Sequence, residues 1–405
     1  MPGTILLVLV AVSLFCALAT HAATHLALFR RPAKPRAPLP PITILKPLCG
    51  FDEDLDENLS SLAEQDYPAP IQIVLGAEDS RDPALDAARR LRDRFPSLDV
   101  LIVHCDRPLG LNPKVNNLSA LLARARFDVV LVSDSNVRAR PGYLRAIASE
   151  LVADPRVELV CNPVVGAGEK SAGAVLETLQ LATFATAAVC ASSVLGGPAC
   201  VIGKSMLFRR RDLEQLGGWW PLRSVLAEDY VLGRAFELLG YRVALSPYVI
   251  GTVNDGWTIE RFVNRHLRWA QMRRRVSPLA FAGELILNPV LWIAIAALAS
   301  RDLRLCLFGA LGVAIKCAAD ALVLRRLGPP PRLRQLLAVP FKDLLLAGVW
   351  GVGAFRRTID WRGTRMRIEA GSQLVPIAAD ERVVARREQG RGARLQDAEL
   401  AQEAA

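Results

Sequence analysis

Apolar residues gather in long runs near the two ends of the chain, whereas its middle alternates short apolar strands with amphipathic helices. Three runs, at 4–29, 281–300 and 303–324, are long enough to cross a bilayer, which takes about 20 residues. The first run holds no acidic or basic side chain apart from His21 and His25. The pattern therefore predicts a multi-pass membrane protein with one folded domain between its first and second spans.

The start of the chain predicts a membrane anchor. A cleaved signal peptide is the alternative, because Ala17-Leu18-Ala19 resembles a cleavage site. The first residues lack the positive charge of a signal peptide, and Arg30 and Arg31 instead follow the apolar run. Since positive flanks stay in the cytosol, the N-terminus is expected outside and residue 30 onward inside.

Two further apolar stretches are not expected to cross the membrane. The run at 335–355 is interrupted by the charged pair Lys342-Asp343, and a crossing there would put the basic stretch 361–367 outside. We therefore expect a re-entrant or interfacial helix at 335–355. The uncharged run at 178–203 would separate candidate site residues across the membrane, so a buried or membrane-leaning helix and loop is expected there.

The span at 303–324 contains two opposite charges, Lys316 and Asp320, four residues apart and so on one helical face. A neutralising pair within the helix is the simpler interpretation, and a transport site is the alternative. The loop at 325–334 is strongly positive and is expected in the cytosol, on the same side as the folded domain.

Between 42 and about 256, the alternation of strand-like and helix-like stretches predicts an α/β domain with a mostly parallel sheet flanked by helices. One helix is expected to open at Asp82-Pro83, where Asp suits the cap and Pro the first helical position. The predicted strands are 42–45, 71–75, 100–103 and 129–132, and the other predicted helices are 53–65 and 117–126.

The net charge of +10 makes nucleic-acid binding a first interpretation. Many Arg residues instead flank apolar runs, and no basic stripe is interleaved with aromatic residues, so a membrane is the expected partner and nucleic acid is not. The 8 Cys form no CxxC pair and only 4 His are present, which argues against a zinc site and a disulfide framework. The Arg-rich, Lys-poor usage suggests a high-GC bacterial source and hence the plasma membrane.

Two acids stand beyond the carboxyl ends of predicted strands, where ligands collect in such sheets. Asp79 follows one strand, and Asp134 directly follows the aliphatic run at 129–132. Mg²⁺ or Mn²⁺ on a nucleotide diphosphate needs only one or two carboxylates from the protein, and Asp134 can supply one. Two residues on stands Asn136, which leaves a neutral ligand or a water at that position. An ordinary turn-forming Asp is the alternative for Asp134.

The pair Glu228-Asp229 stands at an expected helix start. Direct displacement of a nucleotide by an acceptor hydroxyl needs a general base. Asp229 is the candidate, with Glu228 as the alternative. The competing interpretation is an acidic first turn that is stabilised by the helix dipole.

Basic and aromatic residues share one face of a helix predicted at 258–275. Arg265 and Arg268 are three residues apart, and Trp269 follows directly. Guanidinium groups suit a diphosphate leaving group, and an indole can cover a sugar. An interfacial helix whose Arg side chains meet lipid headgroups is the alternative. Lys114 is either a phosphate contact or a solvated loop residue.

Taken in order, these strings resemble the ceramide glucosyltransferase family, a branch of inverting enzymes with the GT-A fold. The resemblance covers nearly the whole chain, and Asn-Pro-Lys-x-Asn-Asn-Leu and Arg-x-x-Arg-Trp are specific in combination. The matching strings are Ile44-Leu-Lys-Pro-Leu-Cys-Gly50, Glu57-Asn-Leu59, Gln65-Asp-Tyr-Pro68, Asp82-Pro-Ala84, Asn112-Pro-Lys-Val-Asn-Asn-Leu118, Asp134-Ser135, Glu228-Asp-Tyr230 and Arg265-His-Leu-Arg-Trp269.

The resemblance implies a membrane hexosyltransferase that moves one glucose-type sugar from a UDP-sugar to a lipid hydroxyl, with ceramide as the acceptor and a divalent metal. It also implies roles for the residues: Asp79 near the uridine, Asp134 at the metal and Asp229 as base, with Arg265, Arg268 and Trp269 closing on the diphosphate. Cys200 falls where the family carries a Cys near the site, and Trp361-Arg362-Gly363 resembles a stretch of bacterial relatives without a role that we can derive.

Three alternatives stay open. A hopanoid-type or other lipid glycosyltransferase would use the same chemistry. A processive polysaccharide synthase usually carries Gln where this chain has Arg265, and needs more spans. A non-catalytic membrane binding protein is the third. The expected organisation is an anchor at 1–30, a cytosolic GT-A catalytic domain at 31–257, an interfacial helix with the Arg-x-x-Arg-Trp motif at 258–280, two transmembrane helices at 281–325, a re-entrant or interfacial helix with a basic stretch at 326–377 and a disordered tail at 378–405.

Overall fold

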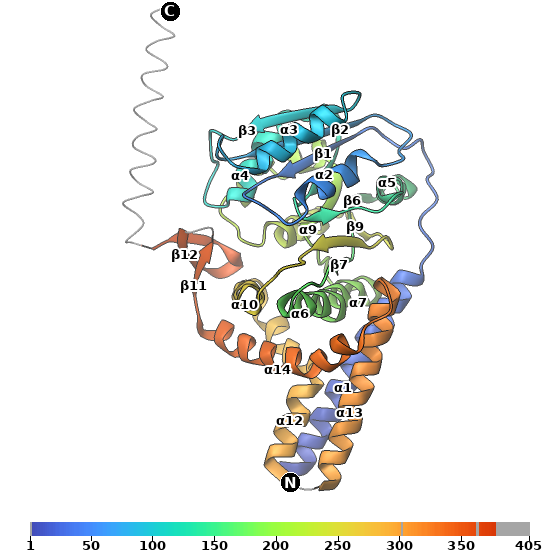
Figure 1. Cartoon of the computed structure of the whole chain (residues 1–405), viewed down its shortest axis with the longest axis vertical. Helices are drawn as coiled ribbons and strands as arrows, with labels where there is room; N and C mark the ends of the chain where they lie inside the picture. The colour runs from blue at the N-terminus through green and yellow to red at the C-terminus, as the bar shows by residue number, and fades with distance from the viewer. Residues whose placement is uncertain (1, 301–302, 362–363, 378–405) are drawn as a thin grey trace, which may run out of the picture.

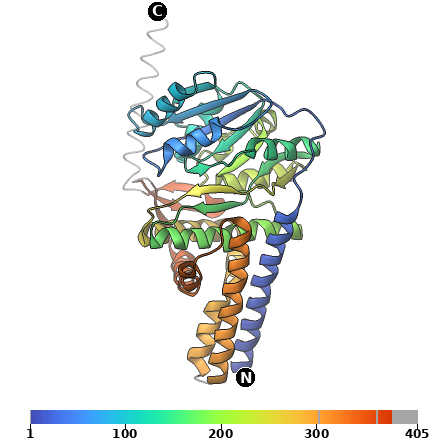
Figure 2. The same cartoon turned by 45° about the vertical axis from the view of Figure 1, so that its right-hand side comes forward.

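The computed structural model describes residues 2–300, 303–361 and 364–377, and the tail predicted at 378–405 lies outside them. Figure 1 shows a folded α/β domain set on a bundle of long helices, with the first helix and the α12–α13 pair leading away from the domain. Figure 2 gives the same arrangement from another side, with α1 beside α13 along its length.

A seven-stranded sheet forms the centre of the domain, in the order β3-β2-β1-β4-β8-β6-β9. Only β8 runs antiparallel to its neighbours, β4 and β6, so the mostly parallel sheet predicted from the sequence is confirmed. The strands are β1 (Ile42–Pro47), β2 (Ile71–Ala77), β3 (Asp99–His104), β4 (Val129–Ser133), β6 (Val157–Cys161), β8 (Ser205–Arg209) and β9 (Arg242–Leu245).

Both faces of this sheet are buried, because successive side chains of a strand point to opposite sides. On β1, Ile44 belongs to one apolar core cluster and Leu45 to the other. The helices that cover the two faces are α2 (Leu55–Ala63), α3 (Ala84–Arg94), α4 (Pro113–Leu122), α5 (Tyr143–Ala153), α8 (Arg210–Gln215) and α9 (Glu228–Leu238), with a short 3₁₀ turn η2 (Trp220–Leu222) before α9.

The helix predicted at 117–126 begins four residues earlier than expected, and its local chemistry explains the shift. Asn112 caps α4 by accepting hydrogen bonds from the backbone N–H groups of Lys114 and Val115, at 2.9 and 3.2 Å. Pro113 takes the first helical position, where its missing N–H costs nothing. This cap puts Lys114 at the edge of the sheet.

Below the central sheet lie a small sheet and an apolar helix. The sheet has the order β5 (Val137–Arg138), β10 (Ile250–Val253), β7 (Val164–Ala167). The helical stretch is α6 (Ala172–Gln180), the π-helical turn η1 (Leu181–Thr186) and α7 (Ala187–Leu195). Figure 1 places α6 and α7 crosswise between β7 and the long helices, the position of the buried or membrane-leaning helix expected at 178–203.

Three helices form the bundle, namely α1 (Pro2–Phe29), α12 (Pro289–Ser300) and α13 (Leu303–Leu327). The stretch expected to span the membrane at 281–300 is bent rather than one continuous helix. The stretch 278–287, made of α11 (Pro278–Gly283) and the 3₁₀ turn η3 (Glu284–Leu287), meets α12 at an angle of 64°. The break falls at Asn288, because the residue before a proline is disfavoured in the helical region.

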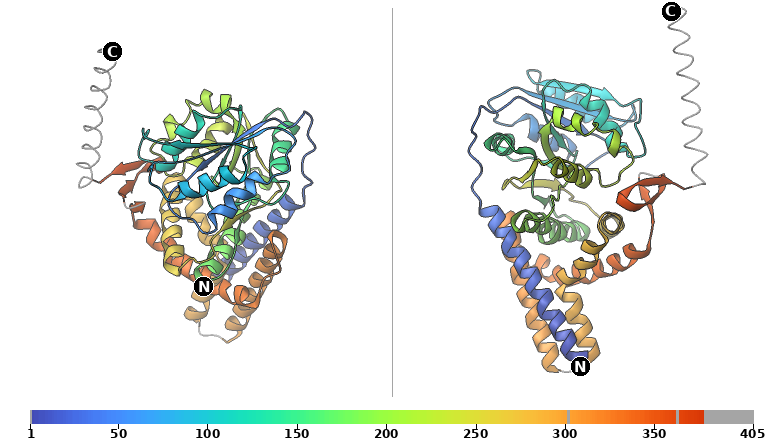
Figure 3. Two further views of the ribbon diagram at one scale, coloured as in Figure 1. Left: turned by 45° about the horizontal axis from the view of Figure 1, so that its top comes forward. Right: turned by 180° about the vertical axis from the view of Figure 1, so that it is seen from behind.

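Two C-terminal elements return to the domain. Figure 1 shows α14 (Leu333–Phe355) lying across the head of the bundle rather than alongside α12 and α13, although it is long and apolar enough to span. A three-stranded antiparallel sheet follows, made of β11 (Thr358–Trp361), β12 (Thr364–Ile368) and β13 (Leu374–Pro376), with the 3₁₀ turn η4 (Ala370–Ser372). The right-hand view of Figure 3 shows this sheet beside the domain, next to α10 (Ile259–Val276).

Candidate active site

A cleft of about 1070 Å³ lies between the edge of the central sheet, α10 and the C-terminal sheet. Seven of the eight residues predicted as site residues line it, from four separate parts of the chain. They are Lys114, Asp134, Glu228, Asp229, Arg265, Arg268 and Trp269.

Asp134 lies at the carboxyl end of β4 and is surrounded by lysines. Lys114 Nζ lies 2.8 Å from Asp134 Oδ1, and Lys204 Nζ lies 3.5 Å from Oδ2. Lys46 Nζ donates to the backbone carbonyl of Asp134. Burial lowers the pKa of Lys46 to about 7 and that of Lys204 to about 8. Burial opposes ionisation of Asp134 as well, but Lys114 and Lys204 hold its pKa below the ordinary value.

Sequence reasoning missed Lys46 and Lys204. Both are buried charged residues, with 0% and 6% of their surfaces exposed. A lysine within the apolar strand β1 was the available signal for Lys46, since such a charge needs a partner. Lys204 has no comparable signal, because its contact with Asp134 depends on β8 pairing with β4.

Glu228 and Asp229 begin α9 and face the same lysine. Lys114 Nζ lies 3.1 Å from Glu228 Oε1. Asp229 accepts hydrogen bonds from the backbone N–H groups of Gly203, at 2.6 Å, and Tyr230, at 2.8 Å. Burial raises the pKa of Glu228 to about 7 and also raises the pKa of Asp229, so this pair holds a proton more readily than ordinary carboxyl groups.

The close approach of Gly203 explains why that position is a glycine. A Cβ there would lie 2.8 Å from Lys114 Nζ and 3.0 Å from Asp229 Oδ2, in the narrowest part of the charged group. Any side chain would push the lysine away from the carboxylates.

Helix α10, which bears Arg265, Arg268 and Trp269, is anchored by Glu177, a residue that the sequence analysis did not single out. Glu177 of α6 is fully buried, with Oε1 3.0 Å from Arg265 Nη1 and Oε2 2.8 Å from His266 Nε2. The Arg265 guanidinium also lies 4.5 Å from the ring centre of Trp269 and 5.0 Å from that of Trp257. Glu177 is the single charged residue between Lys170 and Lys204, which was the signal available in the sequence.

Asp79 does not join this group. It lies past the end of β2 but does not line the cleft, its side chain is 62% exposed, and its nearest charged partner is Arg81, with Nε 3.7 Å from Oδ1. Cys200 does line the cleft, and burial raises the pKa of its thiol to about 11, so the thiol stays protonated near neutral pH.

Asp134 offers one carboxylate to a divalent cation that brings most of its own ligands, and Lys114 Nζ lies 2.8 Å from Asp134 Oδ1. Asn136 Oδ1 accepts a hydrogen bond from Lys204 Nζ at 2.7 Å, so this amide oxygen is already engaged. Within residues 2–300, 303–361 and 364–377, no three His, Cys, Asp or Glu side chains are grouped to hold a metal ion. One carboxylate, with diphosphate oxygens and water, suits Mg²⁺ or Mn²⁺.

The other end of the cleft is mostly apolar, apart from an ion pair between Arg273 and Glu284. Ala188 and Val189 of α7 line it on one side, and Val276, Phe281 and Leu287 line it on the other. Because α7 and η3 pack against α1, this end of the cleft lies near the bundle, whereas the charged end lies at the sheet.

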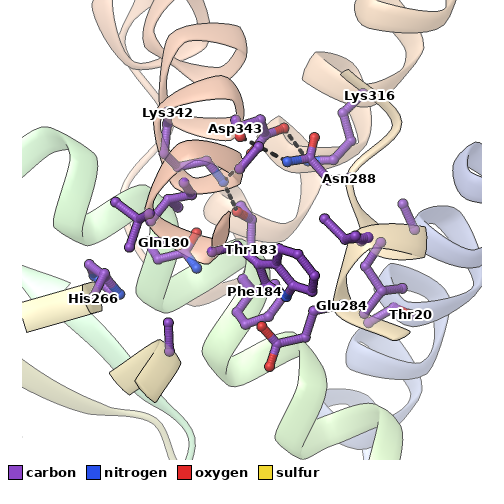
Figure 4. Close-up of a pocket in the computed structure, with 18 of the residues that line it drawn as sticks. Thr20, Gln180, Thr183, Phe184, His266, Glu284, Asn288, Lys316, Lys342 and Asp343 are labelled. Carbon is purple, nitrogen blue, oxygen red and sulfur yellow. Dashed lines mark hydrogen bonds and ion pairs between the residues drawn. The ribbon is translucent and has the colours of Figure 1, made fainter. Parts of the chain in front are cut away.

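A second, smaller cavity of about 70 Å³ lies between the bundle, α14 and η1, and Figure 4 shows its polar lining. Lys316 and Asp320 do form the predicted pair, with Nζ 2.6 Å from Oδ2. His21 Nε2 lies 2.6 Å from Asp320 Oδ1, and Lys342 Nζ lies 2.8 Å from Asp343 Oδ1. Because Lys316 Nζ also lies 3.7 Å from Asp343 Oδ2, the pair is part of a network that joins α1, α13 and α14, which favours a structural role over a transport site.

Comparisons with known proteins agree with this fold. Residues 5–374 match the model of glycosyl transferase family 21. The chain is similar to Ceramide glucosyltransferase 1 of Caenorhabditis elegans, at 26% identity over 245 residues, or 60% of this chain and 52% of that protein. It is also similar to a ceramide glucosyltransferase of Candida albicans, at 33% identity over 115 residues, 26% of this chain and 21% of that protein. The chain thus spans about half the length, or less, of these relatives.

Among solved structures, the fold is similar to that of the mannosyltransferase PcManGT from Pyrobaculum calidifontis, determined in complex with GDP-Man and Mn²⁺. The TM-score is 0.54 at 21% sequence identity, and the match covers 88% of this chain and 99% of that one. The similarity supports the predicted glycosyltransferase fold of the GT-A type, with membrane helices attached.

Proposed function

The chain belongs to glycosyl transferase family 21, and from that premise we propose that it transfers one glucose-type sugar from a UDP-sugar to the hydroxyl of a membrane lipid, with ceramide as the acceptor. The observation that carries the proposal is the cleft, which is charged at the sheet and, apart from the paired Arg273 and Glu284, mostly apolar at the end where α7 and η3 pack against α1. A water-soluble acceptor would have no need of the apolar end. A hopanoid or another hydroxylated lipid is the second candidate acceptor.

The charged end would receive the donor. Lys114, Arg265 and Arg268 can neutralise a diphosphate, and the planar guanidinium groups suit its oxygens. Trp269 can cover the sugar, and its contact with Arg265 would hold the two side chains in one arrangement. Asp79, proposed to lie near the uridine, does not line the cleft.

Asp134 would hold a divalent cation, Mg²⁺ or Mn²⁺, together with the diphosphate. When bound, such a cation neutralises the charge that develops on the leaving nucleotide. Lys204 and Lys114 flank Asp134 and keep its carboxylate ionised, as a metal ligand has to be. The solved mannosyltransferase with Mn²⁺ supports a divalent cation without deciding between the two metals.

Asp229 would act as the general base. The lipid hydroxyl attacks the anomeric carbon, Asp229 takes up the hydroxyl proton, and the bond from the sugar to the diphosphate breaks, so the configuration inverts. The hydrogen bonds from Gly203 and Tyr230 hold the carboxylate in place, and its burial makes it a stronger base than an exposed Asp. Glu228, held by Lys114, is the alternative base.

The catalytic domain is proposed to face the cytosol. Arg30, Arg31, Arg325 and Arg326 lie at the ends of α1 and α13 that meet the domain, which is the arrangement that the positive-inside rule favours. In a bacterium the membrane would be the plasma membrane. The crosswise course of α14 suits the proposed interfacial position better than a further crossing.

The test is incubation of the purified full chain with a panel of UDP-sugars and lipid acceptors, with mass spectrometry of the lipids. One added hexose on ceramide is the expected product. Several added sugars would indicate a processive enzyme, and no transfer or hydrolysis with any donor would indicate a binding protein. Asp229→Asn should abolish transfer while UDP-sugar binding survives, and loss of binding instead would assign Asp229 to donor recognition.

A further inference from the structure

Helix α9 carries the proposed base in its first turn but has no cap of its own. Ala227 occupies the cap position, and its methyl group cannot accept a hydrogen bond. Helix starts expose several backbone N–H groups, which normally find a Ser, Thr, Asp or Asn side chain or water. Ala227 is 1% exposed, so water is a poor substitute here.

The N–H groups of Ala227 and Leu226, at and just before the helix start, find acceptors in the C-terminal sheet, more than a hundred residues later. Ser372 Oγ accepts a hydrogen bond from the backbone N–H of Ala227 at 3.0 Å, and its carbonyl accepts one from Leu226 at 2.9 Å. On the neighbouring residues, the N–H of Leu374 donates to the carbonyl of Ser224 at 2.7 Å. The segment before α9 therefore pairs with the C-terminal turn as an added strand, through an antiparallel bridge between Val225 and Gln373.

The backbone of Ser372 reaches this position in a conformation that serine rarely adopts. Its φ is +65°, in the left-handed region, directly after Gly371, whose φ is also +65°. A non-glycine residue with a positive φ raises the free energy of the folded state, and it persists only where surrounding contacts hold the backbone in that conformation. Full burial of Ser372 and its two hydrogen bonds to the segment before α9 provide that fixation.

The same sheet also packs against α10, which bears Arg265, Arg268 and Trp269. Leu226 forms one buried cluster with Ile359, Met366, Ile368 and Leu374 of the sheet, and Met272 of α10 packs against that cluster. Asp360 and Trp361 of β11 line the cleft. The sheet thus touches α10, which bears the proposed diphosphate contacts, and the segment that leads into α9, which carries the proposed base.

We infer that the C-terminal sheet is a working part of the active site and that Ser372 is a positioning residue, which sets the start of α9 so that Asp229 faces the cleft. The catalytic consequence of this inference rests on the proposed function. The contact between Ser372 and the segment before α9 does not. The sheet acts through backbone geometry, because neither Ser372 hydrogen bond involves a side chain of the catalytic group.

The test compares Ser372→Ala and Ser372→Gly with the full-length wild type in detergent or nanodiscs. Both variants lose the Oγ acceptor, but glycine adopts a φ of +65° without strain. The control is Ser149→Ala, because Ser149 is also buried and its Oγ donates to the carbonyl of Arg145 within α5, away from the cleft. Measurements are the kcat, the KM for the UDP-sugar, and amide hydrogen exchange of the segment 222–232.

Both Ser372 variants should lower kcat about tenfold, equivalent to about 1.4 kcal/mol in the barrier, with less than a twofold change in donor KM. The amides of Leu226 and Ala227 should exchange faster, and Ser149→Ala should match the wild type in each measurement. A Ser372→Gly variant with wild-type kcat would overturn the inference, because the hydroxyl would then be dispensable. Unchanged amide exchange at residues 226 and 227 in both variants would also overturn the inference. This measurement does not depend on transfer activity, so it tests the inference even if the wild type transfers no sugar and the proposed function fails.

Discussion

Replacing Glu177 with glutamine removes one negative charge from the interior of the protein and leaves the size of the side chain nearly unchanged. The carboxylate lies between Arg265 and His266, at 3.0 and 2.8 Å, and is fully buried. The substitution therefore leaves the guanidinium of Arg265, which is only 11% exposed, without its counter-ion. The ring contacts with Trp257 and Trp269 remain.

The size of the effect can be worked from these contacts. Two unit charges about 3 Å apart attract by about 5 kcal/mol at an effective dielectric constant of about 20, before desolvation is subtracted. Removing one partner of a buried pair costs about 3–5 kcal/mol, because the other charge stays buried and unpaired. The cation–π contacts of Arg265 are present in both proteins, so they do not change this difference. We expect Glu177→Gln to lower the free energy of unfolding by about 3 kcal/mol.

The catalytic consequence follows from the freedom that Arg265 gains. Because Arg265 is proposed to bind the donor diphosphate, donor KM should rise and kcat/KM for the UDP-sugar should fall at least tenfold, about 1.4 kcal/mol. The assay is steady-state transfer with varied donor, beside thermal unfolding of the same preparations. A variant that is destabilised but keeps wild-type donor KM would refute the reasoning.

Glu150→Gln is the matched control. Glu150 is 3% exposed and also pairs with an arginine, Arg30, at 3.0 Å, but on the face of the domain toward the N-terminal linker. Since the Arg30 side chain is 43% exposed and can turn to water, the loss of stability should be smaller, and donor KM should not change. An equal loss of activity in both variants would mean that Glu177 matters only for stability.

Four further predictions concern the pH dependence, the metal and the membrane topology. Transfer should rise from about pH 6 and level off above about pH 8, because burial raises the pKa of Glu228 to about 7 and the proposed base pair must lose its proton; a rate independent of pH over that range would contradict this. The same shift, from an ordinary 4.5, means that the folded state binds this proton more tightly, so the contribution of Glu228 to the unfolding free energy declines as pH rises from 4.5 to about 7, as pH-dependent thermal unfolding can measure. Excess EDTA should stop transfer, and Mn²⁺ or Mg²⁺ should restore it, whereas full activity in EDTA would refute the metal role of Asp134. On intact cells, a membrane-impermeant maleimide should label the exposed Cys306, near the α12–α13 connection, and leave the exposed Cys49 of the domain unlabelled; the reverse would invert the proposed topology.

Much of the fold could be predicted from the sequence because it depends on local patterns. The aliphatic run at 129–132 became the buried strand β4, and Asp82-Pro83 led into α3, with Asp82 Oδ1 accepting from the N–H of Ala84 at 2.9 Å. The start of α4 was placed too late because the capping role of Asn112 was overlooked, although the residues were present. The bend at Asn288 was likewise readable from Pro289, but apolar composition outweighed it.

The residues of the candidate site were likewise predictable only in part from the sequence. Asp134, Glu228 and Asp229 could be proposed because each stands at the end of a predicted strand or the start of a helix, and the pattern of the sheet brings such ends to one edge. Asp79 met the same criterion and yet lies outside the cleft, since the criterion does not say which way a loop turns after its strand. Whether these residues perform the proposed chemistry stays a prediction.

By itself, the sequence determined the class of the molecule: an α/β domain with a mostly parallel sheet, apolar helices at both ends, and an ordered set of acids and arginines. These features follow from periodicity, capping and charge placement, which act over a few residues. Tertiary structure alone decided which distant groups meet. Glu177 reaches Arg265 across 88 positions, Lys204 reaches Asp134 through the antiparallel strand β8, and Ser372 completes the start of α9 from the C-terminal sheet. Such contacts are set by how helices and sheets pack, because a buried charge or N–H group takes whichever partner the fold brings within about 3 Å, and nothing in the local sequence names that partner.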